Sequence, residues 1–354
     1  SDLVVVRSRL LCHRNDALYR WWNVSRIIIL NINRDIRMIQ ALSYIVVETP
    51  HLEAWATQAR DHIGMQVETV ELNQCLRLRV DEKIQRFLIM KTAAVASMSM
   101  GFEVANAAEL LNITQNLKDE GYVVTEGTAQ ERLLRGVDDM VFFYDPDGVR
   151  IEVCYGLADA DSPFVPGRPI GGFRTGDMGL GHVALITEHF EQLSHLYRNI
   201  FGFKLSDHTN APFRVEFLHC NPRHHTIGIA HTGGPAKIYH LMLEYNDFDD
   251  VGRAYDMALT KPESIGVTLG RHINDHATSF YLKNPDDWMI ELGWATRTVG
   301  SDWEPTELEG MSLWGHDRTW LSDDKREEAR QILKRLAQKG LRAPVVTTAQ
   351  NLNN

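Results

Sequence analysis

The stretch Asn284-Pro285-Asp286-Asp287-Trp288-Met289-Ile290-Glu291 has a counterpart 139 residues earlier in the chain, Asp145-Pro146-Asp147-Gly148-Val149-Arg150-Ile151-Glu152. In both stretches a Pro-Asp turn opens an apolar run with the composition of a β-strand, and each run contains one glutamate. A match at a fixed offset indicates an internal repeat, and a repeat decides how the whole chain is divided.

The upstream parts of the two halves repeat in the same way. An offset of 138 residues takes Thr49 to Thr187 and Gly64 to Gly202. In each half a strand-like run leads to the threonine, which we predict to cap an amphipathic helix that ends at the glycine. Each half should therefore run strand, helix and then several strands, so the sequence predicts an α+β fold with two similar domains.

The composition narrows the kinds of partner. The chain has 354 residues, 44% hydrophobic and 24% charged, which is typical of a globular protein with a sizeable core. Its formal net charge of -10 argues against a nucleic-acid surface and against an anionic membrane. No apolar run approaches the ~20 residues of a membrane-spanning helix. The charge therefore favours a small-molecule partner. The four cysteines, Cys12, Cys75, Cys154 and Cys220, stand far apart and include no CxxC pair, so neither a disulfide framework nor a zinc site is indicated. We therefore expect reduced thiols in a cytoplasmic protein.

Glu291 places one carboxylate in the middle of an apolar, strand-like run. Burial of an unpaired charge is costly, so Glu291 should have a cationic partner. Two other strand-like runs of the second half carry His182 and His240. Taken singly, each of these residues is more often a hydrogen-bonded core residue than a metal ligand. Together, two histidines and one carboxylate form the facial set that leaves open positions on a non-haem iron.

The first half differs at these positions. Tyr44 stands where the second half has His182, no counterpart of His240 is found around Phe102, and only Glu152 matches its partner in the second half. If all three groups were needed for folding, both halves should keep them. We therefore expect one metal ion, in the second half.

Histidine is dense in the second half. The pair His224-His225 precedes a strand-like run, and the segment 270–276 leads toward the strand of Glu291. Such a pair usually lies on a solvated hairpin. In an extended segment, alternation could instead direct one histidine of the pair into a cleft while its neighbour points the other way.

Four stretches carry a family resemblance. They are Gly179-Leu180-Gly181-His182, Leu218-His219-Cys220-Asn221-Pro222-Arg223-His224-His225, Leu269-Gly270-Arg271-His272-Ile273-Asn274-Asp275-His276 and Ile290-Glu291-Leu292-Gly293-Trp294. With consistent spacing from about 38 to about 318, the chain resembles the type I extradiol ring-cleavage dioxygenases. Within that family it is most similar to the 2,3-dihydroxybiphenyl 1,2-dioxygenases and their steroid-catechol relatives. The resemblance implies paired βαβββ modules of the vicinal oxygen chelate fold, which is also the glyoxalase, bleomycin-resistance and dioxygenase fold.

The resemblance also implies an activity and the residues that perform it. The activity is extradiol (meta) cleavage of a catechol, a substituted or bicyclic 2,3-dihydroxyaryl compound, by O2 at a mononuclear non-haem Fe(II), with Mn(II) as the alternative ion, in aromatic compound degradation. A homo-oligomer is expected. By motif position, the metal ligands are His182, His240 and Glu291, the catalytic residues are His225, His272 and Tyr281, and the substrate-binding residues are Ala184, Phe217, Asn274, Asp275 and Met311.

The predicted organisation follows from the repeat and the resemblance together. Arginine recurs without a steady period before Met38, which we take as the natural start, and proline and glycine mark a linker at 163–174. The predicted parts are a disordered leader (1–37), an N-terminal module pair without metal (38–158), a C-terminal catalytic module pair with metal (176–300), and a C-terminal extension (301–354) with a helix at 323–339.

Two other functions remain open for this fold. A metal-dependent lyase or isomerase of the glyoxalase type would use histidine and glutamate ligands, but it would not need His225, His272 and Tyr281. A non-enzymatic small-molecule binding protein of the bleomycin-resistance kind would lack the three ligands altogether. Metal analysis combined with oxygen uptake on a catechol separates the three functions.

Overall fold

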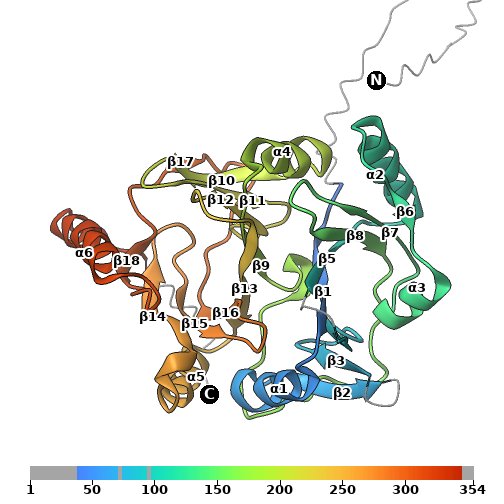
Figure 1. Ribbon diagram of the computed structural model, residues 1–354, viewed down its shortest axis with the longest axis horizontal. Coiled ribbons are helices and arrows are strands. Elements are labelled where there is room, and N and C mark those ends of the chain that lie inside the picture. Colours follow the sequence, from blue (N-terminus) through green and yellow to red (C-terminus); the bar gives the residue numbers. More distant parts are fainter. Residues whose placement is uncertain (1–37, 71–73, 94–96, 345–354) are drawn as a thin grey trace, which may run out of the picture. The chain divides into compact units, whose positions relative to one another are not determined.

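The computed structural model describes residues 38–70, 74–93 and 97–344. The predicted leader, 1–37, lies outside these residues. The described chain forms two mixed β-sheets, one of eight strands and one of ten. In Figure 1 the first sheet runs from blue to green and the second from yellow-green to red. Among the helices of the described part, none is long and apolar enough to span a membrane.

The first sheet consists of two βαβββ modules. The elements of the first module are β1 (Ala41–Thr49), α1 (Leu52–Thr57) continued by the π-helical turn η1 (Gln58–Ile63), β2 (Gln66–Val70), β3 (Cys75–Arg79) and β4 (Phe87–Lys91). Those of the second are β5 (Ser97–Glu103), α2 (Ala107–Asp119), β6 (Thr125–Glu126), α3 (Ala129–Arg135), β7 (Asp139–Tyr144) and β8 (Arg150–Tyr155). The strand order is β2-β3-β4-β1-β5-β8-β7-β6, so the first strands of the two modules pair antiparallel in the middle.

The second sheet repeats this plan after the short turn η2 (Gly176–Met178). Its first module has β9 (His182–Ile186), α4 (Phe190–His195) continued by η3 (Leu196–Ile200), β10 (Lys204–Thr209), β11 (Arg214–His219) and β12 (Ile227–His231). Its second module has β13 (Lys237–Tyr245), α5 (Phe248–Leu259), η4 (Pro262–Ser264), β14 (Ile265–His272), β15 (Thr278–Lys283) and β16 (Met289–Trp294). The core order β10-β11-β12-β9-β13-β16-β15-β14 has the same arrangement as the first sheet. The predicted α+β fold of paired βαβββ modules is confirmed.

The C-terminal extension joins the second sheet. It supplies β17 (Thr306–Glu307), β18 (Ser312–Gly315) and α6 (Asp323–Gln338). The strand β17 pairs with β10 and β18 pairs with β14, so the extension adds one strand to each edge of the sheet. Helix α6 lies where the sequence predicts a helix at 323–339.

The starts of two helices differ from the prediction. Strand β1 continues through Thr49, and the N-cap of α1 is His51, whose backbone N–H donates to Oγ1 of Thr49 over 2.9 Å. Thr187 accepts from the N–H of His189, the N-cap of α4, over 2.8 Å in the same way. The predicted threonine caps are therefore wrong by two residues, because Thr49 ends β1, Thr187 directly follows β9, and each threonine accepts from the residue that caps the helix.

The strand-to-helix turn of each half contacts the Pro-Asp turn of the other half. Oγ1 of Thr49 donates to Oδ1 of Asp286 over 2.7 Å, and Nδ1 of His189 lies 2.7 Å from Oδ1 of Asp147. Asp147 and Asp286 occupy matching positions in the two Pro-Asp turns. One apolar core also includes residues of both sheets, with Phe102 packed edge-on against Phe201. The repeated turn thus opens a strand in its own module and holds the other half of the chain.

Candidate active site

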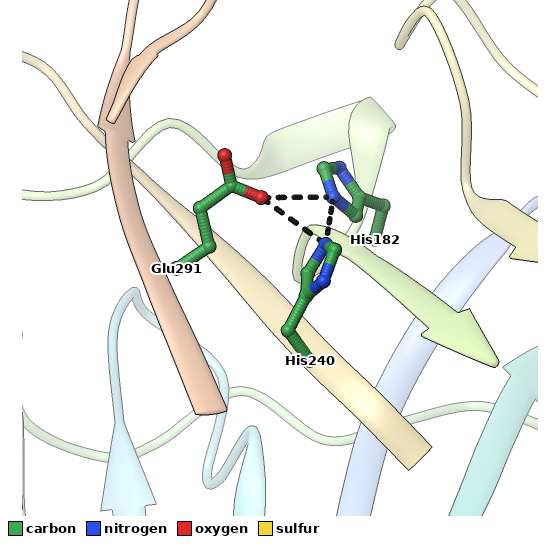
Figure 2. Close-up of side chains that lie close together, drawn as sticks. All are labelled: His182, His240 and Glu291. Atoms are coloured by element: carbon green, nitrogen blue, oxygen red, sulfur yellow. Dashed lines mark hydrogen bonds and ion pairs between the residues drawn. The ribbon is translucent and has the colours of Figure 1, made fainter. Parts of the chain in front are cut away.

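Three donor atoms converge in the middle of the second sheet. His182 begins β9, His240 lies on β13 and Glu291 on β16, three adjacent strands. Nε2 of His182 lies 3.0 Å from Nε2 of His240, and Oε2 of Glu291 lies 3.3 Å and 3.1 Å from these two nitrogens. Figure 2 shows the three side chains pointing toward one another. The strand order brings together residues that are far apart in the sequence.

This arrangement fits one divalent cation. Donor atoms about 2.1 Å from one ion and at right angles to each other lie about 3 Å apart, which matches the observed separations. The three side chains are buried, and Nδ1 of His240 has no hydrogen-bond partner among the described residues. Burial lowers the pKa of His240, which keeps its imidazole neutral. Burial opposes ionisation of Glu291, but bonds with His182, His240 and His272 outweigh it and hold the pKa of Glu291 well below its usual range.

His225 lies directly beside the three donors. Its ring stacks on the ring of His182 with the centroids 3.9 Å apart, and Phe217 packs edge-on against it at 4.9 Å. His225 is 3% exposed, and burial lowers the pKa of its imidazole well below the usual value. A neutral imidazole can accept a proton, so the position and charge state suit a general base.

The neighbouring His224 is also buried, and it is not solvated. Its Nδ1 lies 3.1 Å from Nδ1 of His225, and its Nε2 lies 2.8 Å from Oδ2 of Asp207. Asp207 also accepts hydrogen bonds from Arg297 and Thr306. The usual interpretation of such a pair, a solvated hairpin face, is therefore wrong here, because a buried carboxylate holds the outer histidine inside the fold.

His272 and Tyr281 also lie beside the donor cluster, against Glu291 and His240. Nδ1 of His272 donates to the carbonyl oxygen of Met311 over 2.9 Å, so Nε2 is the atom that faces the site. This Nε2 lies 2.7 Å from Oη of Tyr281 and 3.2 Å from Oε1 of Glu291. Burial raises the pKa of Tyr281 well above its usual value, which keeps its hydroxyl protonated. Burial disfavours protonation of His272, but its bond to Glu291 outweighs this effect and raises its pKa.

Of the residues predicted to bind substrate, three are apolar and two are polar. Phe217 and Met311 belong to one apolar cluster, while Ala184 stands opposite His240 in the pairing of β9 with β13. Asn274 and Asp275 form the turn between β14 and β15. Oδ2 of Asp275 lies 4.0 Å from Nδ1 of His225, and Oδ1 of Asn274 is buried without a hydrogen-bond partner in the described part of the chain.

Comparisons with known proteins give the family. Residues 179–292 match the model of the Glyoxalase/Bleomycin resistance protein/Dioxygenase superfamily. The chain is 35% identical over 285 residues to biphenyl-2,3-diol 1,2-dioxygenase of Metapseudomonas furukawaii, a match that covers 78% of this chain and 93% of that protein. This chain belongs to the extradiol dioxygenases.

Two further matches agree. An iron-dependent extradiol dioxygenase of Rhodococcus jostii (strain RHA1) is 36% identical over 293 residues, covering 79% of this chain and 97% of that protein. The crystal structure of a halotolerant catechol dioxygenase superposes with a TM-score of 0.76 at 29% identity, covering 80% of this chain and 96% of the other. The resemblance drawn from the four stretches is confirmed. The iron-dependent relative and the cluster of His182, His240 and Glu291 together support a bound metal ion.

Three residues of this extradiol dioxygenase contact the site without having been singled out in its sequence. They are Asp207, Ser279 and His316. Oγ of Ser279 donates to Oε1 of Glu291 over 2.6 Å, and the ring of His316 stacks on that of His272 with centroids 4.1 Å apart. No short spacing links these residues to the histidine motifs. The alternation of β15 places Ser279 and Tyr281 on one face, and this was the one available signal.

The N-terminal half of the dioxygenase has an ion pair at the matching place. Glu152 accepts a hydrogen bond from Oη of Tyr44 over 2.8 Å and two from Arg135 over 2.6 and 2.7 Å. The register of β1 with β5 pairs Val46 with Ser99, as the register of β9 with β13 pairs Ala184 with His240. Ser99 is therefore the positional counterpart of His240. The guanidinium of Arg135 neutralises the carboxylate that corresponds to Glu291.

Two cavities lie away from the three donors. One of about 910 Å³ is lined by residues of both halves, among them Arg135 and Arg150 of the first half and Trp288 of the second. The other, of about 560 Å³, lies beside the start of α5 and includes Phe248 and Trp294. Neither is lined by a donor of the candidate metal site.

Proposed function

We propose that this extradiol dioxygenase opens the ring of a bicyclic 2,3-dihydroxyaryl compound beside its diol, using O2 and an Fe(II) ion held by His182, His240 and Glu291. The observation that carries the proposal is the convergence of three donor atoms within 3.3 Å of one another, with His225 stacked on one of them. The relative from Metapseudomonas furukawaii, a biphenyl-2,3-diol 1,2-dioxygenase, supports the bicyclic substrate.

Iron is the ion that the donor set favours. Two imidazoles and one carboxylate on one face leave positions open, as in non-haem Fe(II) oxygenases, and the relative from Rhodococcus jostii is iron-dependent. A bound Fe(II) would supply Lewis acidity and electron transfer toward O2. Mn(II) has the same preference for oxygen and imidazole ligands, so metal analysis of the purified protein decides between the two.

Two residues beside the metal donors have different roles in proton transfer: His225 accepts a proton and Tyr281 donates one. Because Nε2 of His224 donates to Asp207, its Nδ1 accepts the proton on Nδ1 of His225. This tautomer leaves Nε2 of His225 as a free lone pair, which can take the proton of a diol hydroxyl and later return it to the product. When His272 is protonated, its Nε2 donates to Oη of Tyr281, which leaves the hydroxyl proton of Tyr281 for a substrate oxygen.

The second ring of the substrate would contact an apolar wall. The ring of Phe217 packs against His225, and Phe217 belongs to the same apolar cluster as Met311. A second aromatic ring packed there would keep water away from the diol. Asn274 offers a buried Oδ1 that lacks a partner in the described structure, and a polar group of the substrate could satisfy it.

Oxygen consumption tests the proposal. Protein reconstituted with Fe(II) without oxygen is mixed with biphenyl-2,3-diol, 1,2-dihydroxynaphthalene, 3-methylcatechol or catechol, and kcat/KM is measured from O2 uptake. Equal consumption of O2 and diol is expected, with the highest kcat/KM for a bicyclic diol. Turnover without O2 would favour the glyoxalase-type lyase or isomerase. Light scattering on the same sample tests the predicted homo-oligomer.

A further inference from the structure

The two oxygens of the Glu291 carboxylate have different surroundings. Oε2 faces His182 and His240, whereas Oε1 accepts a hydrogen bond of 2.6 Å from Oγ of Ser279 and lies 3.2 Å from Nε2 of His272. Ser279 is fully buried and stands on β15, beside the strand of Glu291. One oxygen is thus directed to the metal position while the other is held by the protein.

A chain of hydrogen bonds continues from Ser279. The single hydroxyl proton of Ser279 goes to Glu291, so Oγ accepts from Nε2 of His316, 3.2 Å away, which also lies 3.1 Å from the carbonyl oxygen of Ser279. With its proton on Nε2, His316 accepts at Nδ1 from Oγ of Ser312 over 2.8 Å. The N–H at Nε2 of His316 is shared between Oγ and the carbonyl oxygen of Ser279, and the direction of the chain runs from Ser312 toward Glu291.

His316 is held in this place by the C-terminal extension. Strand β18 pairs with β14, and His316 follows it with a left-handed φ of 54°. A side chain at Gly270 would come within 2.5 Å of the His316 ring, so only glycine allows the ring to lie there. Backbone strain in a non-glycine residue persists where the surroundings over-determine it, often at a functional site. The ring of His316 also stacks on His272.

We propose that Ser279 and His316 are positioning residues that hold Glu291 as a ligand through one oxygen only. This inference rests on the proposed function. A carboxylate free to turn could bind the ion through both oxygens and occupy a position that the substrates need. Partners behind a metal ligand typically change metal affinity or activity 10- to 100-fold. The C-terminal extension, through His316, thereby completes the metal site.

Metal affinity tests the proposal without relying on turnover. For Ser279→Ala we expect the Fe(II) dissociation constant, measured by competition with a coloured chelator, to rise about 10- to 100-fold. The visible bands of the Co(II)-loaded variant should shift, since they report the number of ligands, while the melting temperature of the metal-free protein should change little. Ser279→Thr keeps the hydroxyl and should retain most of the affinity. His316→Gln keeps a donor and should weaken Fe(II) binding less than His316→Leu.

A matched control is available between helix α4 and strand β11 of the same half of the chain. Oγ of buried Ser194 donates to Oε2 of Glu216 over 2.7 Å, a similar bond at a site without metal ligands. Ser194→Ala should leave both the Fe(II) dissociation constant and the Co(II) spectrum unchanged. The double variant Ser279→Ala/His316→Leu should bind Fe(II) no more weakly than Ser279→Ala alone, because both changes interrupt one chain.

The outcomes separate the two levels of the proposal. Wild-type affinity and spectrum in Ser279→Ala would overturn the positioning role while leaving the metal site in place. Weaker binding in His316→Leu but not in Ser279→Ala would also overturn it, because His316 would then act through His272. A wild-type protein that does not bind Fe(II) would overturn this inference together with the proposed function.

Discussion

Nδ1 of His224 lies 3.1 Å from Nδ1 of His225. Alternation along an extended segment predicts that one histidine of the pair faces the cleft and the other points away. Both side chains are buried, and the outer one connects the inner one to Asp207. A substitution of His224 is therefore no neutral control for His225, and the two positions give separate predictions.

The first prediction concerns His225 as the proton carrier. His225→Gln can still form a hydrogen bond but cannot carry a proton at neutral pH. General acid-base assistance contributes ~10²–10⁴-fold, so kcat should fall by about that factor. The Fe(II) content and the diol dissociation constant should change much less. Stopped-flow single turnover measures the step, and an unchanged kcat would remove His225 from this role.

The second prediction concerns the residues behind His225. Asp207→Asn and His224→Gln should each lower kcat between about 10- and 100-fold, because the tautomer of His225 is no longer fixed, while KM changes less. The exposed His195, which pairs with Glu120, provides the control, and His195→Gln should keep wild-type kcat. Steady-state O2 uptake measures all three variants. Equal kcat in wild type and Asp207→Asn would show that the pair needs no carboxylate.

The third prediction concerns the ion pair in the N-terminal half. Arg135→Leu leaves the buried carboxylate of Glu152 with Arg150 as its remaining cation. Removal of one partner from a buried pair typically costs 3–5 kcal/mol, so the free energy of unfolding should fall by about 3 kcal/mol. Urea denaturation measures the loss. The double variant Arg135→Leu/Glu152→Gln should recover a large part of it, and a single variant as stable as wild type would contradict the assignment.

The fourth prediction concerns Asp145 in the first Pro-Asp turn. Burial raises its pKa to about 6, and Oδ2 has no partner among the described residues. Asp145 therefore favours folding below about pH 4, its ordinary range, and this contribution is lost as pH rises through about 6. The second half has Asn284 at the matching position. Asp145→Asn should raise the free energy of unfolding at pH 7 by roughly 2–3 kcal/mol and by much less at pH 4.

A pH series of denaturation curves for wild type and Asp145→Asn checks this expectation. Oδ1 of Asp145 accepts from the backbone N–H groups of Asp147 and Val149, and an asparagine oxygen can accept both bonds. The same stability difference at pH 4 and pH 7 would show that ionisation of Asp145 is not its cause.

Much of the fold could be predicted from the sequence because the signals that define the repeat are short stretches of neighbouring residues. The Pro-Asp turns and the glycines that end the helices have fixed offsets, and the ligand types His182, His240 and Glu291 stand on strand-like runs. The spatial order β9-β13-β16 is not local, since it depends on how the modules pair. Ser279 and His316 reach Glu291 through that pairing and through β18, so apart from the alternation that places Ser279 on the face of Tyr281, no spacing along the chain indicated them.

Iron content tests the central proposal most directly. Wild-type protein reconstituted with Fe(II) and freed of excess metal should contain one iron per chain, and His240→Ala should contain none and consume no O2 with biphenyl-2,3-diol. Ser99→Ala, altered at the counterpart position in the N-terminal half, should keep one iron and wild-type O2 uptake. Unchanged iron in His240→Ala would contradict the proposed metal site.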